Sequence, residues 1–226
     1  MPTRIYLVRH GSTSLTAEDR FAGSSDVLLS EEGRLQVSAL ASRLQNEPLD
    51  AVYCSPLIRT METAQIIAAP HRLTPIPEAG LREIDYGHWE GLTRFEVERD
   101  YAHEYAIWQE DPFTMAPVGG ESGVNVINRV LPLFRRIMDT HRHRNVLIVS
   151  HKGTNRLLIT SLLGFDMRSY RDRLDQSPAG LTILDFMNEV RPRLRLFNDV
   201  SHYESVPPRI QSPRLSKWWG GHATKS

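Results

Sequence analysis

The feature that most limits the folds open to this chain is its alternation of short apolar runs with amphipathic stretches. Apolar runs over residues 5–8 and 145–149 have the length and continuity of strands that are buried on both faces. Helices between such strands connect parallel neighbours. The sequence therefore predicts an α/β fold whose mostly parallel sheet carries helices on both faces. We expect two further strands, over residues 51–54 and, more weakly, 73–76, and helices over residues 31–44, 60–68, 122–140 and 157–163.

The C-terminal part of the chain departs from this alternation. Residues 181–184 and 194–197 alternate around a turn at Asn188, which is typical of an antiparallel hairpin. We expect the hairpin to complete the sheet.

These patterns also suggest a domain organisation. We expect residues 1–203 to form one domain, with residues 93–118 as a cap or insertion that is helical and aromatic-rich over residues 93–111. Residues 204–226 carry prolines and glycines that break any periodicity, so an irregular tail containing Trp218 and Trp219 is expected.

Composition excludes several classes of function. The 226 residues include 27 basic and 27 acidic side chains, and the formal net charge is zero, which argues against a nucleic-acid binder. Cys54 is the one cysteine, so no intrachain disulfide can form, as is usual in a reducing compartment. No apolar run approaches the length of a membrane span. We expect a cytoplasmic protein that acts on a small molecule and binds neither nucleic acid nor a membrane. A homodimer is compatible with this composition.

Reactive side chains follow four of the predicted strands. Arg9 and His10 come directly after the first strand, and Arg59, Glu83 and His151 come shortly after the second, third and fourth. Because the carboxyl ends of parallel strands meet at one edge of a sheet, we expect these side chains to face one crevice. Imidazole can act as a nucleophile, guanidinium groups suit phosphate, and a carboxyl group can move a proton. The set favours phosphoryl transfer.

Two other phosphate chemistries fit less well. Cysteine phosphatases place an arginine six residues after the nucleophile, but Arg59 follows Cys54 by five residues and Pro56 removes a backbone donor from the loop. No G-x-x-x-x-G-K-[ST] loop is present, so a nucleoside triphosphatase of the P-loop type is excluded.

The pair His141 and His143 lacks the carboxylates or thiols that would support a metal site.

The spaced motifs resemble one family. In order, they are Arg9-His10-Gly11, residues 55–60 (Ser-Pro-Leu-Ile-Arg-Thr), Glu83, residues 120–122 (Gly-Glu-Ser) and residues 149–151 (Val-Ser-His). This order resembles the histidine phosphatase superfamily, with its phosphoglycerate-mutase-like fold, over roughly residues 3–200. The resemblance implies that His10 becomes phosphorylated, that Arg9, Arg59 and His151 surround the phosphoryl group, and that Glu83 is the general acid and base. It implies neither metal nor cofactor.

Three further residues are predicted to bind the substrate. Gly23 is a smaller match to the family, and Thr16 stands where relatives often have a phosphate-binding Asn. Lys152 follows His151, where many relatives have a small residue. Its ammonium suits a second anionic group on the substrate, or it points to solvent.

The sequence thus predicts a metal-independent phosphatase that hydrolyses a small phosphomonoester through phosphohistidine. Sugar phosphates, phosphoserine, α-ribazole phosphate and a carboxylated sugar phosphate are the substrates that the resemblance allows. One alternative is a phosphoglycerate-type phosphomutase, although such mutases carry a longer insertion between the Glu83 loop and Gly120. The other is a non-catalytic module that binds a phosphorylated ligand.

Overall fold

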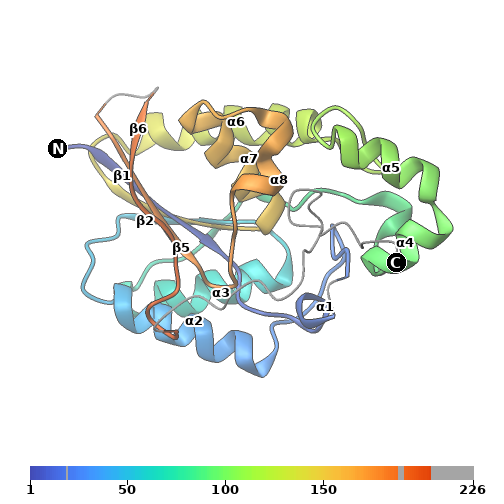
Figure 1. Cartoon of the computed structure of the whole chain (residues 1–226). Helices are drawn as coiled ribbons and strands as arrows, with labels where there is room; N and C mark the ends of the chain where they lie inside the picture. The colour runs from blue at the N-terminus through green and yellow to red at the C-terminus, as the bar shows by residue number, and fades with distance from the viewer. Residues whose placement is uncertain (19, 188–190, 205–226) are drawn as a thin grey trace.

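The structure is a computed structural model that describes residues 1–18, 20–187 and 191–204 (Figure 1). At its centre lies a six-stranded sheet in the order β3-β2-β4-β1-β5-β6. The strands are β1 (Thr3–Arg9), β2 (Ala51–Cys54), β3 (Ile76–Pro77), β4 (Asn145–Ser150), β5 (Leu181–Phe186) and β6 (Pro192–Asp199). The first four are parallel, and β5 and β6 form an antiparallel hairpin beside β1. The predicted fold class is confirmed.

Helices cover both faces of the sheet (Figure 1). α2 and α3 pack on one face, while α6 and α7 pack on the other. α4 and α5 lie beyond the end of β1, to the right of the sheet in Figure 1. The helices are α1 (Ser14–Ala17), α2 (Glu31–Leu44), α3 (Ile58–Ala68), α4 (Arg94–Asp100), α5 (Ala102–Glu110), α6 (Gly123–Thr140), α7 (Lys152–Leu163) and α8 (Tyr170–Arg173). Across the described ranges, none of them is long and apolar enough to cross a membrane.

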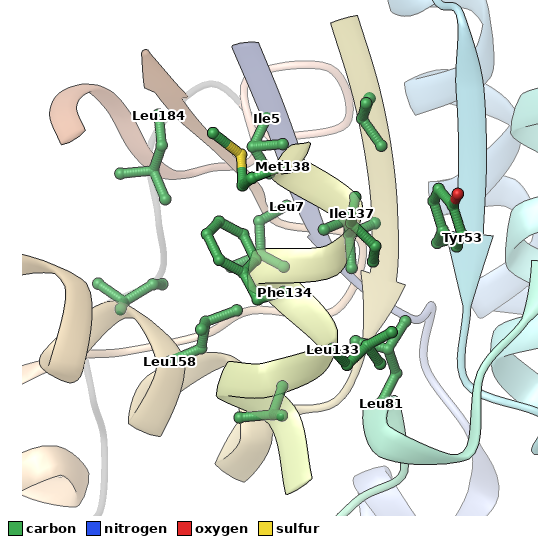
Figure 2. Packing of buried hydrophobic residues seen from close by; sticks show 14 of the residues in the cluster. Ile5, Leu7, Tyr53, Leu81, Leu133, Phe134, Ile137, Met138, Leu158 and Leu184 are labelled. Carbon is green, nitrogen blue, oxygen red and sulfur yellow. The ribbon is translucent and has the colours of Figure 1, made fainter. Parts of the chain in front are cut away.

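The alternation of side chains along a strand explains why the core has two layers. In β1, Ile5 and Leu7 belong to the cluster under α6, whereas Tyr6 and Val8 belong to the cluster under α2 and α3. Successive side chains of a strand point to opposite faces, so one short run serves both layers. Figure 2 shows the first layer, in which Leu133, Phe134 and Ile137 of α6 pack over Ile5, Leu7 and Leu184 of the sheet.

Local signals set several helix ends. The Ser30 side chain accepts a hydrogen bond from the Gly33 amide and caps α2, with Glu31 and Glu32 in the first turn. α7 ends at Gly164, whose φ of 72° is a left-handed conformation that glycine adopts without strain.

Some predicted elements were wrong in extent. The strand expected over residues 73–76 is reduced to β3, because prolines at 75 and 77 remove ladder donors. α7 starts five residues before the predicted Leu157, since its polar first turn carries no apolar periodicity. The predicted turn at Asn188 and the residues of the tail from 205 onward, with Trp218 and Trp219, lie outside the described residues.

The region from 93 to 118 forms two helices, α4 and α5, where the sequence indicated one helical stretch. The short helices α1 and α8 were not predicted at all, since four residues carry too little periodicity to be recognised. α6 continues through Pro132, which sits within its bounds.

We expect Ile137→Ala to lower the free energy of unfolding by about 2–5 kcal/mol, because it removes buried methyl groups and leaves a cavity. Ile137 is 1% exposed beneath the long helix α6. Leu35→Ala on α2 is the control, since Leu35 is 67% exposed and its loss should change stability by less than about 0.5 kcal/mol. Urea unfolding of both variants measures the difference, and equal losses would contradict the assignment of the core.

Candidate active site

The pairing of β1 with β4 brings two histidines together. Arg9 is in register with Ser150, so His10 and His151 are the next residues on adjacent parallel strands. The His10 amide donates to the Ser150 carbonyl at 3.1 Å, and the two imidazole ring centroids lie 5.2 Å apart at 63°. Both rings are buried. The carboxyl ends of β1 and β4 therefore hold the two imidazoles side by side, as the sequence predicted.

A backbone contact fixes the state of the His10 ring. Its Nδ1 lies 2.7 Å from the Gly11 carbonyl oxygen, which can only accept a hydrogen bond. Nδ1 therefore carries the proton, and Nε2 keeps a lone pair. Burial, together with the charges of Arg59 and Arg9, holds the pKa of His10 well below its usual value of 6.5. A neutral ring with a free Nε2 is the form that a nucleophile needs.

The two arginines are held by backbone carbonyls. Arg9 Nη1 donates to the Gln176 carbonyl at 2.6 Å. Arg59 Nη1 and Nη2 donate to the carbonyls of Ser25 at 2.6 Å and Gly23 at 2.8 Å. These contacts orient the guanidinium groups without neutralising them, because a carbonyl carries no net charge.

The centre of the site is short of acceptors. Within the described part of the chain, the buried atoms Nε of Arg9, Nε of Arg59, and both ring nitrogens of His151 have no hydrogen-bond partner. Burial lowers the pKa of Arg9 to about 10, and the Glu83 carboxylate acts against this shift. Burial likewise lowers the pKa of Arg59. Unpaired buried donors are costly, so this arrangement fits an anion with several acceptor oxygens.

Backbone amides at the start of α7 hold the Glu83 carboxylate in place. Its Oε2 accepts from the Gly153 amide at 3.0 Å, and its Oε1 accepts from the amides of Ile84 at 2.9 Å and Thr154 at 3.1 Å. A Cβ on Gly153 would lie 2.9 Å from Glu83 Oε1 and 2.8 Å from Ile84, so a side chain there would displace one of them. The ligand-free site thus holds Glu83 as an acceptor, the form that a general base needs.

Arg129, on α6, fixes the loop that carries Glu83. Its guanidinium donates to the carbonyls of Gly80, Arg82 and Glu83 at 2.8–2.9 Å. It also binds both carboxylate oxygens of Glu121, at 2.9 and 2.8 Å. A planar group with five donors suits this many acceptors. The sequence did not predict this role of Arg129, because an arginine within an amphipathic helix looks like any other polar residue.

The structure gives Gly23 and Thr16 other contacts. Gly23 has a φ of 47°, and a Cβ there would collide with the Glu90 carboxylate; its carbonyl holds Arg59. The Thr16 hydroxyl lies 3.0 Å from that of Thr13, in the capping box that begins α1. Their binding of substrate stays a prediction.

Lys152 is the first residue of α7, and its charge contributes to lowering the pKa of the Asp175 carboxyl. Beyond it lie two arginines that the sequence did not indicate as functional, Arg156 on α7 and Arg171 on α8. Arg171 gave no signal in the sequence, because α8 itself was not predicted.

Known proteins are similar to this chain in sequence and in fold. Residues 5–200 match the family model described as histidine phosphatase superfamily (branch 1). The chain belongs to the histidine phosphatase superfamily. It is 36% identical over 167 residues to phosphoserine phosphatase 1 of Hydrogenobacter thermophilus, covering 74% of this chain and 79% of that protein. It is 32% identical to 2-carboxy-D-arabinitol-1-phosphatase of Triticum aestivum, covering 92% of this chain but 42% of the wheat protein.

The structural comparison agrees. The solved structure of Bacillus stearothermophilus YhfR superposes with a TM-score of 0.83 at 30% identity, covering 89% of this chain and all of that one (100%). The predicted resemblance is confirmed, and with it the enzyme class of the histidine phosphatases.

We expect the ligand-free protein to lose stability as the pH falls from 7 to 5.5. Burial first, and then the charge of Arg59, keep the pKa values of His10 and His151 well below 6.5, so both rings stay neutral in the fold. In the unfolded chain they take up protons near pH 6.5, which favours unfolding by at most about 1.4 kcal/mol per pH unit for each ring.

Urea unfolding at several pH values measures this slope. His151→Gln should reduce it without abolishing it, because His10 remains. His202, whose pKa is lowered by burial to about 4, also adds to the slope in both proteins. Stability that is constant or rises on acidification would show that the rings are protonated in the fold.

Proposed function

We propose that this protein is a metal-independent phosphatase that hydrolyses a small phosphomonoester through a phosphohistidine intermediate on His10. The observation that carries the proposal is the set of unpartnered buried donors of Arg9, Arg59 and His151 around the His10 ring. A phosphoryl group supplies the acceptor oxygens that these donors lack. Phosphoryl transfer depends mainly on positioning and on stabilising spread negative charge, which this arrangement provides.

In the first step, His10 Nε2 attacks phosphorus. The N–P bond forms as the bond from phosphorus to the ester oxygen breaks. Glu83, an acceptor in the ligand-free site, takes up one proton as the substrate binds and gives it to the leaving alcohol. In the second step, Glu83 takes a proton from water as the water oxygen attacks phosphorus. The N–P bond breaks, inorganic phosphate leaves, and Glu83 is protonated again.

The relatives favour a small substrate. Relatives named above are phosphatases of phosphoserine and of 2-carboxy-D-arabinitol 1-phosphate. Since these differ in their alcohol, we propose the shared class, a phosphorylated small metabolite.

The donor set supports chemistry without a metal. In residues 1–18, 20–187 and 191–204, no group of three or more His, Cys, Asp or Glu side chains is placed to hold an ion. The two guanidinium groups already supply fixed positive charge beside the nucleophile. Hydrolysis of p-nitrophenyl phosphate should therefore persist in excess EDTA.

We expect His10→Ala to abolish hydrolysis of p-nitrophenyl phosphate, lowering kcat by at least about a thousandfold, because no second nucleophile replaces Nε2. His103→Ala is the matched control, since His103 is exposed on α5. Rapid alkaline quenching and mass spectrometry of the wild type should find acid-labile phosphate on His10. Phosphate on another residue, or substantial activity of the variant, would overturn the mechanism.

We expect Glu83→Gln to slow alkyl phosphates far more than p-nitrophenyl phosphate. A basic alkoxide needs a proton to leave, whereas p-nitrophenolate does not, and a general acid contributes about 10²–10⁴-fold. The measurement is the burst and steady-state rate for a primary alkyl phosphate and for p-nitrophenyl phosphate. Equal losses in the bond-breaking step would assign the acid to another carboxyl group.

A further inference from the structure

A second group of cations lies beside the phosphoryl site, between α7, α8 and the cap helix α5. It consists of Arg156 on α7 and Arg171 on α8, with Trp108 of α5 against Arg171. α8 packs beside α7, as Figure 1 shows. The proposed mechanism uses neither arginine.

Arg171 is a buried cation with donors to spare. Arg171 is 6% exposed, and its guanidinium carbon lies 4.1 Å from the centre of the Trp108 ring. Nη2 donates to the Gln109 carbonyl at 3.1 Å. Among the residues that the structure describes, no acceptor contacts Nε or Nη1. Stacking covers a face of the guanidinium plane but satisfies none of its N–H groups. Like Arg9 and Arg59, Arg171 therefore has buried N–H donors without a hydrogen-bond partner.

Arg156 extends the group toward the phosphoryl site. It follows His151 by five residues, a rise of about 7.5 Å along α7. Its Nη2 lies 3.4 Å from the Asp175 carboxylate, while its buried Nε has no partner in the described ranges. Asp175, the partner of Arg156, directly precedes Gln176, whose carbonyl accepts from Arg9 Nη1 at 2.6 Å. Arg156 therefore lies next to the segment that holds Arg9 of the phosphoryl site.

The two arginines differ in their partners. Asp175 pairs with Arg156, whereas Arg171 contacts the neutral Gln109 carbonyl and the Trp108 ring. A single negative charge with two acceptor oxygens, as in a carboxylate, matches the unpaired donors better than the dianion of a second phosphate.

We propose that Arg171, assisted by Arg156, binds a carboxylate on the alcohol part of the substrate, so that the enzyme prefers phosphate esters of short hydroxy acids. This inference rests on the proposed function, because the carboxylate is placed relative to a phosphoryl group on His10. It also gives Lys152 a role through charge, beside arginines that make the direct contacts.

The test is competition against p-nitrophenyl phosphate, which lacks a second anionic group. Three probes share a three-carbon chain: 3-phosphoglycerate, glycerol phosphate and propane-1,3-diol bisphosphate. In the wild type, 3-phosphoglycerate should inhibit at least about tenfold more strongly than glycerol phosphate, the expected effect of a charge-assisted hydrogen bond. Thermal stabilisation by each compound gives the same ranking without reference to turnover.

The variants locate the preference. Arg171→Gln should reduce the ratio of the two inhibition constants to less than about threefold, and Arg156→Gln should reduce it in the same direction if Arg171→Gln does not fold. Arg168→Gln is the matched control, because Arg168 is exposed, lies three residues away and pairs with Asp111 at 3.2 Å. It should leave both the ratio and the hydrolysis of p-nitrophenyl phosphate unchanged.

Each failure has its own signature. Equal inhibition by 3-phosphoglycerate and glycerol phosphate, or a preference that survives in both arginine variants, would overturn the carboxylate site. Stronger inhibition by the bisphosphate than by 3-phosphoglycerate would show that the site takes a dianion and that the carboxylate assignment is wrong. A wild type that does not hydrolyse p-nitrophenyl phosphate would instead overturn the proposed function, and thermal stabilisation would still report on the subsite.

Discussion

The register of β1 against β4 is the constraint on which the rest of the structure depends. Because Arg9 pairs with Ser150, the two strands end at the same level, and His10 and His151 emerge side by side. Both strands are apolar on both faces, so two layers of core hold them in place. A shift of one residue would send every side chain of β1 to the opposite layer. The core therefore fixes the distance between the imidazoles, and with it the geometry of the site.

This rigidity sustains an arrangement that is electrostatically unfavourable in isolation. Arg9 and Arg59 are buried with backbone carbonyls as partners, and their charges act on the neutral rings of His10 and His151. Burial of unpaired cations opposes folding, and the apolar layers beneath must offset that cost. The benefit appears when an anion enters, because the donors are already oriented and need no reorganisation. The same lack of acceptors that destabilises the free protein would favour the proposed phosphohistidine state.

The sequence predicted those parts of the molecule in which chemistry follows directly from chain order. His10 and His151 could be placed because each ends an apolar run, and the ends of parallel strands meet. Ser30 and Gly164 marked helix ends by their own backbone preferences. Arg171 could not be placed, because α8 has four residues and its contact with Trp108 joins segments 63 positions apart. Arg129 shows the same limit, since what it holds is a loop that the sequence leaves without shape.

The division between what could and could not be predicted corresponds to a division of labour in the site. Groups that would act on the phosphoryl group stand at the ends of β1 and β4, in the first turn of α3 and in the loop that carries Glu83. Arg171 stands on a short helix and is tied to the cap through Trp108 and the Gln109 carbonyl. A carboxylate bound by Arg171 and Arg156 would connect α8 to α7, which starts at the end of β4. Recognition of the alcohol would then be separate from the chemistry at the strand ends, which would stay the same for any ester that fits.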